Sequence, residues 1–231
     1  MTDLHCHVLP FVDDGSKSLE ESILMIEESI NQGIKNLVLT PHYRQGVFTK
    51  DDSEIVAAFE VLKREVEKRA LPINLFLGRE ITVFKEFSKL IESKNFLTLG
   101  GGKFVLIEFP YQTEVDIEEI CYSVKLNGFI PVVAHVERYS YFRNVKDVER
   151  LKKNGVVIQV NCSPIVNKSY TEENKFVKKL LKNRLVDVVA SDNHFSRVNY
   201  MAKAYQKVKS KYKDYADLIF KTNPEYIIKQ K

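Results

Sequence analysis

The chain has 231 residues, 44% of them apolar, so it is long enough to bury a sizeable core in one large domain or two small ones. Its 35 basic and 31 acidic residues leave a net charge of +4 and are mixed along the whole length, a balance too weak to indicate nucleic acid as a partner. The sequence has no signal peptide, no run suited to membrane insertion and no disulfide framework among its three cysteines, which predicts a cytoplasmic protein.

Seven short runs of β-branched and apolar residues have the length and composition of buried strands. In chain order they lie at 2–5, 36–40, 73–78, 104–109, 130–135, 156–161 and 186–191. Helical spacing fills the intervals, at 19–30, 52–70, 83–93, 114–127, 145–153, 172–184 and 198–219. Strands alternating with helices predict a parallel sheet covered by helices, and seven units favour a barrel in a single domain over residues 1–231.

The first predicted helix shows the clearest boundaries. Its apolar residues recur at helical intervals from Leu19 to Ile30. Ser18 with Glu21 has the spacing of a capping box at its start, and Gly33 is a typical helix stop. We therefore expect this helix to end just before Gly33.

Polar side chains gather at the ends of the predicted strands, where parallel βα folds place their functional sites. A single histidine is more often a hydrogen-bonded core or loop residue than a ligand. Here, however, all five histidines fall at strand ends and none falls on a predicted helix. Together with acidic residues in the same places they give nine candidate ligands, namely His5, His7, Asp14, His42, Glu80, Glu108, His135, Asp192 and His194.

These residue types indicate a metal site. A carboxylate at the end of a buried strand is costly unless it is paired or bound to a cation. Imidazole and carboxylate ligands without a cysteine cluster suit divalent Mn, Fe or Zn. His5 and His7 point to the same side of a strand, whereas Cys6 faces the other way and belongs to the core. Nine candidates are too many for one ion, so two or three are expected.

Four stretches together resemble the polymerase-and-histidinol-phosphatase (PHP) superfamily. They are HxHxxPxxDDG at 5–15, TPHYRQG at 40–46, VVAHVERY at 132–139 and VASDNH at 189–194. Within that superfamily the chain is most similar to the manganese-dependent protein-tyrosine phosphatases of bacterial capsule and exopolysaccharide gene clusters. The resemblance covers nearly the full chain and implies a distorted (β/α)7 barrel.

The resemblance also implies how the nine ligands divide among three ions. The first ion would be held by His5, His7, Glu80 and Asp192. Glu80 would bridge to a second ion, which Glu108 and His135 complete, and Asp14, His42 and His194 would hold the third. Relatives often carry histidine in place of Glu108. Asp13 competes with Asp14, which is preferred because it precedes the glycine.

Metal ions about 3.5 to 4 Å apart can share a hydroxide and clamp a phosphate between them. The hydroxide would attack phosphorus in line with the ester oxygen, and an arginine's planar fork would receive the phosphoryl charge. Arg138 and Arg197 each lie three residues past a histidine and are the expected catalytic arginines. Arg44 is a further candidate, and each of the three has a solvated loop position as its alternative.

Aromatic residues also gather in the loops near the expected mouth of the site. One or two could flank a phosphotyrosine ring, although a loop aromatic more often packs against its neighbours. The candidates are Phe11, Tyr43, Phe48, Tyr111, Tyr139 and Tyr141.

The expected activity is hydrolysis of phosphotyrosine by a metal-bound hydroxide. The resemblance implies an autophosphorylated bacterial tyrosine kinase as substrate, with Mn²⁺ as cofactor and Fe or Zn open. A thiol mechanism is excluded, because Val12, Asn127 and Lys168 stand where an arginine would have to follow each cysteine by six residues. Histidinol phosphate or another small phosphomonoester remains an alternative substrate. A PHP nuclease and a non-catalytic binding protein are the other classes considered.

Overall fold

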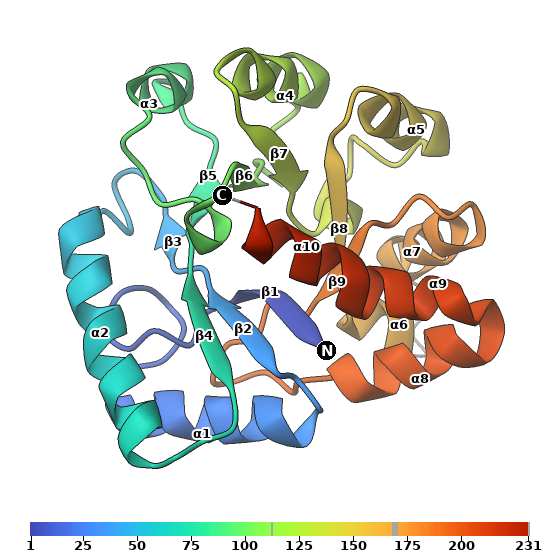
Figure 1. Cartoon of the computed structure of the whole chain (residues 1–231). Coiled ribbons are helices and arrows are strands. Elements are labelled where there is room, and N and C mark those ends of the chain that lie inside the picture. Colours follow the sequence, from blue (N-terminus) through green and yellow to red (C-terminus); the bar gives the residue numbers. More distant parts are fainter. Residues whose placement is uncertain (112, 168–170, 231) are drawn as a thin grey trace.

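All named strands pair in parallel in the computed structural model, which describes residues 1–111, 113–167 and 171–230 (Figure 1). The strand segments are β1 (Thr2–Cys6), β2 (Asn36–Leu39), β3 (His42–Tyr43), β4 (Asn74–Leu77), β5 (Glu80–Thr82), β6 (Phe104–Glu108), β7 (Ile130–Val133), β8 (Val157–Asn161) and β9 (Val188–Ala190). They form a sheet in the order β1-β2-β4 and a second in the order β3-β5-β6-β7-β8-β9.

These segments correspond to the seven predicted strands. β2 and β3 are halves of one strand interrupted at Thr40 and Pro41, and β4 and β5 are halves of the next. The last strand returns to the first, because the backbone N–H of Asp192 donates to the carbonyl of His5 at 2.9 Å. The distorted barrel inferred from the sequence is confirmed.

The interruption of the third strand corrects the predicted position of Glu80. The sequence placed Glu80 beyond the end of that strand, whereas it begins the second segment, β5. The break falls at Gly78, where a Cβ atom would come within 3.2 Å of the Leu99 backbone. The chain bends at this close contact and resumes pairing at Glu80, which turns its side chain toward the barrel centre.

The helices follow the strands and surround them (Figure 1). Their bounds are α1 (Leu19–Asn31), α2 (Asp52–Lys68), α3 (Phe87–Ser93), α4 (Ile117–Leu126), α5 (Val145–Lys153), α6 (Ser163–Val166), α7 (Glu172–Lys182), α8 (Met201–Tyr212), α9 (Asp214–Asp217) and α10 (Asn223–Lys229). No helix of the described ranges is long and apolar enough to cross a membrane.

At the start of α1 the predicted N-cap is present, but the predicted capping box is incomplete. Ser18 accepts a hydrogen bond from the N–H of Glu21, as a helix N-cap does. The Glu21 carboxylate, however, accepts from the N–H of Lys17 at 2.6 Å and not from Ser18, so the reciprocal bond of a capping box is missing. The end is as predicted, because Gly33 follows the helix with a φ of +79°.

The single helix predicted at 198–219 is wrong. Lys213 adopts a φ of 49°, which separates α8 from α9. A π-helical turn at Leu218–Thr222 then leads into α10, which the sequence analysis missed. Pro224 is tolerated because it occupies the first turn of α10, where its missing N–H has no helical partner.

Two apolar cores stabilise the fold. The larger lies between the strands and the surrounding helices. A smaller one fills the barrel with Leu4, Val38, Leu106, Val132 and Val188, together with Ile227 and Ile228 of α10. Figure 1 shows α10 crossing the barrel beside the start of β1, so this helix closes the end opposite the strand carboxyl ends. Its close approach needs Gly102, where a Cβ atom would lie 1.9 Å from the Gln230 carbonyl oxygen.

Tyr139 connects the ends of two neighbouring strands. Its side chain is fully buried, and its hydroxyl accepts from the N–H of Phe109 at 3.1 Å while it donates to the carbonyl of Ala134 at 2.8 Å. Of the six aromatic candidates, Tyr139 is therefore a structural residue. It fixes the loops that follow β6 and β7.

Replacing Tyr139 with phenylalanine tests this role. Tyr139→Phe leaves a buried N–H and a buried carbonyl without their partner, so we expect the free energy of unfolding to fall by about 1–3 kcal/mol. Urea denaturation followed by circular dichroism measures the change. Tyr122→Phe is the matched control, because Tyr122 is 62% exposed. An equal effect of both substitutions would contradict the assignment.

Candidate metal centre

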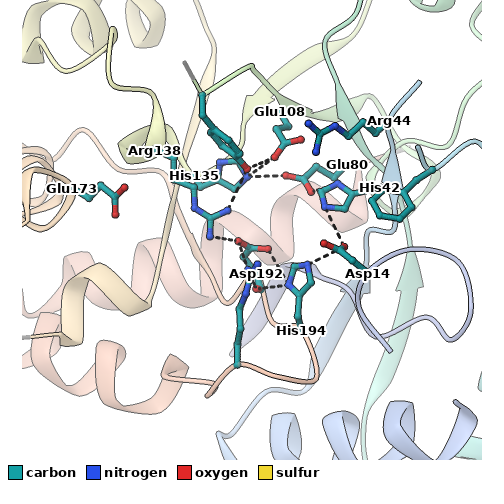
Figure 2. A pocket seen from close by; sticks show the side chains of 13 residues that line it. Asp14, His42, Arg44, Glu80, Glu108, His135, Arg138, Glu173, Asp192 and His194 are labelled. Atoms are coloured by element: carbon teal, nitrogen blue, oxygen red, sulfur yellow. Dashed lines mark hydrogen bonds and ion pairs between the residues drawn. The ribbon is translucent and has the colours of Figure 1, made fainter. Parts of the chain in front are cut away.

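The carboxyl ends of the strands bring all nine predicted ligands to one region. A pocket of about 380 Å³ opens there, and Figure 2 shows seven of the nine among its lining side chains. His5 and His7, both fully buried, are the two that do not line the pocket. We call the group around these two histidines the inner part of the site, and the group that includes the half-exposed Asp14 the outer part.

The inner part consists of His5, His7, Glu80 and Asp192. The Nε2 atoms of His5 and His7 are 3.2 Å apart, and they lie 3.2 and 3.3 Å from Glu80 Oε2. Asp192 Oδ1 lies 3.6 and 3.5 Å from the same two nitrogens. Four ligands placed tetrahedrally at about 2.1 Å from an ion would be about 3.4 Å apart, so these spacings fit a shared cation.

A register shift in β1 aims the two histidines at this point. The shift lies between Asp3 and Cys6, within β1. Leu4 points into the barrel core, and with regular alternation the next residue would point away from it. The irregularity instead turns His5 inward as well, which is how bulges often re-aim side chains beside functional sites. Cys6 is buried in the outer core, as the sequence predicted.

Glu80 links this group to a second one. Its other oxygen, Oε1, is 2.8 Å from Nε2 of His135, which in turn is 3.7 Å from Glu108 Oε1. Glu108 is held on both sides, by the hydroxyl of Thr82 at 2.6 Å and by the hydroxyl of Tyr111. The structure thus brings Glu80, Glu108 and His135 together, and the two oxygens of Glu80 face histidines of different groups.

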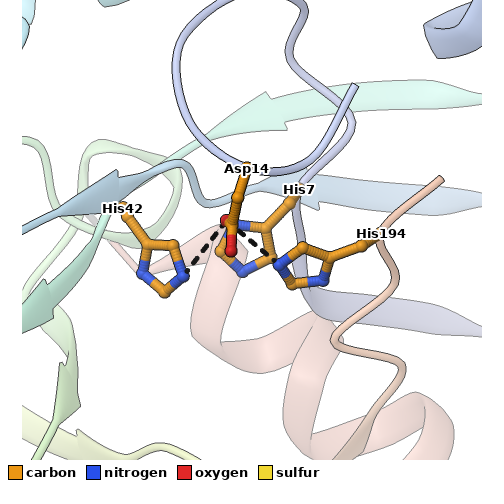
Figure 3. Close-up of side chains that lie close together, drawn as sticks. All are labelled: His7, Asp14, His42 and His194. Atoms are coloured by element: carbon orange, nitrogen blue, oxygen red, sulfur yellow. Dashed lines mark ion pairs between the residues drawn. The ribbon is translucent and has the colours of Figure 1, made fainter. Parts of the chain in front are cut away.

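The third group faces the pocket (Figure 3). Asp14 Oδ1 lies 3.7 Å from His42 Nε2 and 3.3 Å from His194 Nε2, and its side chain is half exposed. The His7 ring stacks on that of His194, with ring centroids 4.1 Å apart, so this outer group rests on the inner one. Asp14, His42 and His194 meet as predicted.

The two adjacent aspartates differ in their surroundings. Asp13 is saturated, because its carboxylate accepts from Nδ1 of His7 at 2.7 Å, from the N–H of His42 at 3.0 Å and from the N–H of Gly15 at 2.9 Å. Asp14 faces two histidine nitrogens instead. Gly15 is required here, since a Cβ atom would lie 2.0 Å from the His7 carbonyl oxygen. Asp13 therefore orients His7, and Asp14 keeps its place among the candidate ligands.

The unused ring nitrogens support a metal centre. Nδ1 of His5 donates to Gln159 Oε1 at 3.1 Å, Nδ1 of His7 to Asp13, and Nδ1 of His194 to the carbonyl of Asp192 at 3.1 Å. In each case Nε2 is left pointing at the other candidate ligands. Metal-binding histidines are oriented in this way by a second hydrogen bond.

Two buried side-chain atoms of the nine candidate ligands form no hydrogen bond with the described residues. Glu80 Oε2 and His42 Nδ1 lie 2.9 Å apart, but their geometry does not allow a hydrogen bond. A buried carboxylate oxygen so close to three ring nitrogens is stabilised if a cation lies between them. The donor set therefore fits a divalent metal ion.

The pKa shifts of the candidate ligands bear on whether they can bind a divalent metal ion. Burial raises the pKa of the Glu80 and Asp192 carboxyls, but the surrounding histidines, His5 foremost, and Arg138 beside Asp192 together outweigh it and hold both pKa values well below the usual range. Burial lowers the pKa of His135 and His194, so both rings are neutral at pH 7. Against the effect of burial, the neighbouring carboxylates raise the pKa of His5 and His7. Carboxylates bind metal when ionised and imidazoles when neutral, so a cation would displace the protons from these two rings.

Two supporting residues escaped the sequence analysis. Gln159 of β8 binds His5 and also accepts from the N–H of His135 at 2.9 Å, while its amide donates to Asn161 at 2.8 Å. Asn161 then donates to Asp192 Oδ2 at 3.0 Å. The sequence did contain a signal for them, because both amides lie in the buried strand VVIQVN. Polar side chains in a buried strand require hydrogen-bond partners.

Two ligands have strained backbones. His135 has a φ of 29° and Asp192 a φ of 49°, which residues with a Cβ atom rarely adopt. Both lie just past the last strand residue, where the chain turns. Such strain occurs mainly at functional sites, because the surrounding structure must hold it in place.

The predicted arginines lie at the same pocket. Arg138 Nη2 is 2.7 Å from Asp192 Oδ2, and Arg197 Nη1 is 3.1 Å from the same oxygen. Arg44 lines another part of the pocket and forms no ion pair with any described residue (Figure 2). Glu173 of α7 also lines the pocket and was not predicted.

The aromatic candidates separate into three groups. Phe48 and Tyr111 line the pocket, and the Phe48 ring stacks on His42 with an interplanar angle of 8°. Phe11 is exposed on the loop that precedes Asp14. Tyr43 lies under the Arg79 guanidinium and Tyr141 donates to the carbonyl of Pro110, so these two are structural like Tyr139.

Comparison with known proteins gives consistent matches over the whole chain. Residues 1–229 match the family model described as capsular polysaccharide synthesis, CpsB/CapC. The tyrosine-protein phosphatase CpsB of Streptococcus agalactiae is 36% identical, over 99% of this chain and 98% of the relative. The tyrosine-protein phosphatase YwqE of Bacillus subtilis is 31% identical, over 84% of this chain and 77% of the relative.

A solved structure agrees with this. The chain is similar, with a TM-score of 0.91 and 28% identity, to one of the crystal structures of YwqE from Bacillus subtilis and CpsB from Streptococcus pneumoniae. The match covers 100% of this chain and 96% of the other. Those proteins are described as unique metal-dependent tyrosine phosphatases.

The two aspartates can be distinguished by metal binding. We expect Asp14→Asn to lower the number of bound ions by one, because it removes a ligand of the outer group. Asp13→Asn should keep the stoichiometry but weaken metal affinity by about 10–100-fold, since it disturbs the orientation of His7 without removing a candidate ligand. Mass spectrometry of bound metal together with chelator competition measures both. The reverse pattern would show that Asp13 is the ligand.

Proposed function

The chain belongs to the capsular polysaccharide synthesis family CpsB/CapC, and we propose that it is a metal-dependent tyrosine-protein phosphatase of the PHP superfamily. Such an enzyme hydrolyses the phosphate monoester of tyrosine. The observation that carries the proposal is the position of two arginines directly above a cluster of nine candidate metal ligands.

The ligand groups supply the nucleophile and part of the charge. Divalent ions, when bound, would provide a hydroxide at neutral pH and a positive site for the phosphate. His5, His7, Glu80 and Asp192 would hold the innermost ion. The groups completed by Glu108 and His135, and by Asp14, His42 and His194, would hold the others at the pocket floor.

The arginines orient the phosphate. Asp192 Oδ2 accepts from Arg138 and Arg197 while its Oδ1 faces His5 and His7, so one carboxylate aligns the arginines with the metal site. Burial disfavours the charged form of Arg138, but Asp192 together with Tyr111 and Glu137 outweighs it and raises the pKa, so the guanidinium stays charged. Its remaining N–H groups are suited to phosphoryl oxygens.

An aryl ester suits this site. Tyrosinate has a parent pKa of about 10 and leaves more readily than a serine alkoxide, so little general-acid help is needed. Phe48 and Tyr111 place aromatic rings beside the phosphate pocket, where a phosphotyrosine ring would lie.

The metal, the partner and the location are further parts of the proposal. We propose Mn²⁺ as the cofactor, with Fe and Zn as alternatives, because imidazole and carboxylate ligands without thiolates accept all three. An autophosphorylated bacterial tyrosine kinase that controls polysaccharide synthesis is the proposed substrate. The proposed location is the cytoplasm.

A substrate panel with and without metal tests the function. We expect the protein loaded with Mn²⁺ to hydrolyse phosphotyrosine peptides faster than phosphoserine peptides, histidinol phosphate or single-stranded DNA. Chelation should reduce the rate to background, and added Mn²⁺ should restore it. The variant with His5→Ala and His7→Ala should remain inactive after metal is added.

Each substrate in the panel can give a result that contradicts one part of the proposed function. Phosphotyrosine hydrolysis that survives the double substitution would overturn the metal mechanism. A preference for histidinol phosphate would overturn the substrate, and degradation of DNA would indicate a nuclease.

The arginines are tested by conservative substitution. Arg138→Lys and Arg197→Lys keep the charge but lose the planar fork, so we expect kcat to fall by about 10²–10³-fold, as when one donor to a transition-state oxygen is removed. Arg64→Lys on the exposed surface of α2 is the control. Steady-state rates on a phosphotyrosine peptide measure the effect, and unchanged kcat in both variants would remove the arginines from the mechanism.

A further inference from the structure

Exposed apolar side chains are unevenly distributed over the molecule. Twelve large apolar residues are exposed in the described part of the chain, and seven of them lie on helices. The other five all lie in loops that follow the carboxyl ends of strands. These residues, which we call the apolar rim, are Phe11, Val47, Tyr111, Phe195 and Val198.

The rim is continuous with the phosphate pocket. Tyr111 belongs to both, and Val47, Phe195 and Val198 are direct sequence neighbours of the lining residues Phe48, His194 and Arg197. Phe11 precedes Asp14 by three residues, and Asp14 lies 3.3 Å from His194. Loops from four different strands thus carry apolar groups toward the pocket that Arg44, Arg138 and Arg197 help to line.

Phe11 shows that this exposure is not incidental. Its side chain is 68% exposed, whereas Val8, Leu9 and Val12 in the same loop are buried. Its backbone has a φ of 63°, a conformation that glycine or asparagine adopts more readily than phenylalanine. Phe11 therefore lowers the stability of the fold in two ways. Its backbone is strained, and its apolar ring is exposed to water. Binding a partner would offset the second cost.

Resting on the proposed function, we propose that the apolar rim binds the polypeptide on either side of the phosphotyrosine and gives the enzyme a preference for apolar flanking residues. The pocket takes the dianionic phosphate, and the rim contacts the neighbouring side chains. A second copy of the chain is disfavoured as the occupant, because seated on the rim it would cover the pocket.

The test compares two peptides and one small ester. The peptides are identical except for leucines or serines at the two positions on each side of the phosphotyrosine, and the ester is p-nitrophenyl phosphate. We expect the Mn²⁺-loaded protein to have a kcat/KM about five- to tenfold higher for the leucine peptide, the gain from partly burying one aromatic ring. Phe11→Asn and Phe195→Ser should each reduce this ratio toward one.

Controls separate binding from folding. Phe11→Asn should unfold at the same or a higher temperature than the parent protein, because asparagine tolerates a positive φ. Phe11→Leu should retain most of the peptide preference. Leu126→Ser, at a residue 69% exposed on α4, should retain all of it.

The outcomes are distinct. An unchanged peptide ratio in both Phe11→Asn and Phe195→Ser overturns the proposal, and so does a parent protein without leucine preference. A dimer that Phe11→Asn converts to a monomer, seen by light scattering, also overturns it in favour of self-association. Failure to hydrolyse either peptide overturns the proposed function itself, whereas hydrolysis without preference overturns the rim alone.

Discussion

The structure depends on one buried carboxylate. Glu80 is completely buried, yet its two oxygens lie within 3.3 Å of ring nitrogens from His5, His7, His42 and His135. A carboxylate so placed is stable only if positive charge surrounds it. Protons on His5 and His7, whose pKa values are raised, provide that charge in the protein alone, and metal ions would replace them on binding. The breaks in the second and third strands and the bulge in β1 all serve to direct side chains at this carboxylate.

Much of this could be predicted from the sequence, because strand ends in a parallel barrel converge. Knowing that His5, Glu108 and Asp192 lie at the carboxyl ends of different strands is enough to bring them together. Proximity alone does not assign roles, however. Asp13 and Asp14 are adjacent and chemically identical, and only the three hydrogen bonds that saturate Asp13 distinguish them.

The errors have local physical causes. The helix expected at 198–219 breaks because Lys213 takes a positive φ, which no composition or periodicity signals. Gln159 went unnoticed because it lies inside a strand that otherwise reads as apolar core. Its role depends on contacts with His5 and with the backbone of His135, which come from other strands. Such contacts exist only once the barrel has closed.

The position of α10 also affects the order of assembly. This helix is synthesised after all of the strands, yet its Ile227 and Ile228 complete the core inside the barrel. Until α10 has left the ribosome, the strands that carry the ligands surround an interior that is still open at one end. Domains fold as units during synthesis, so the arrangement of the nine candidate ligands is complete only when the last helix has become available to close the barrel.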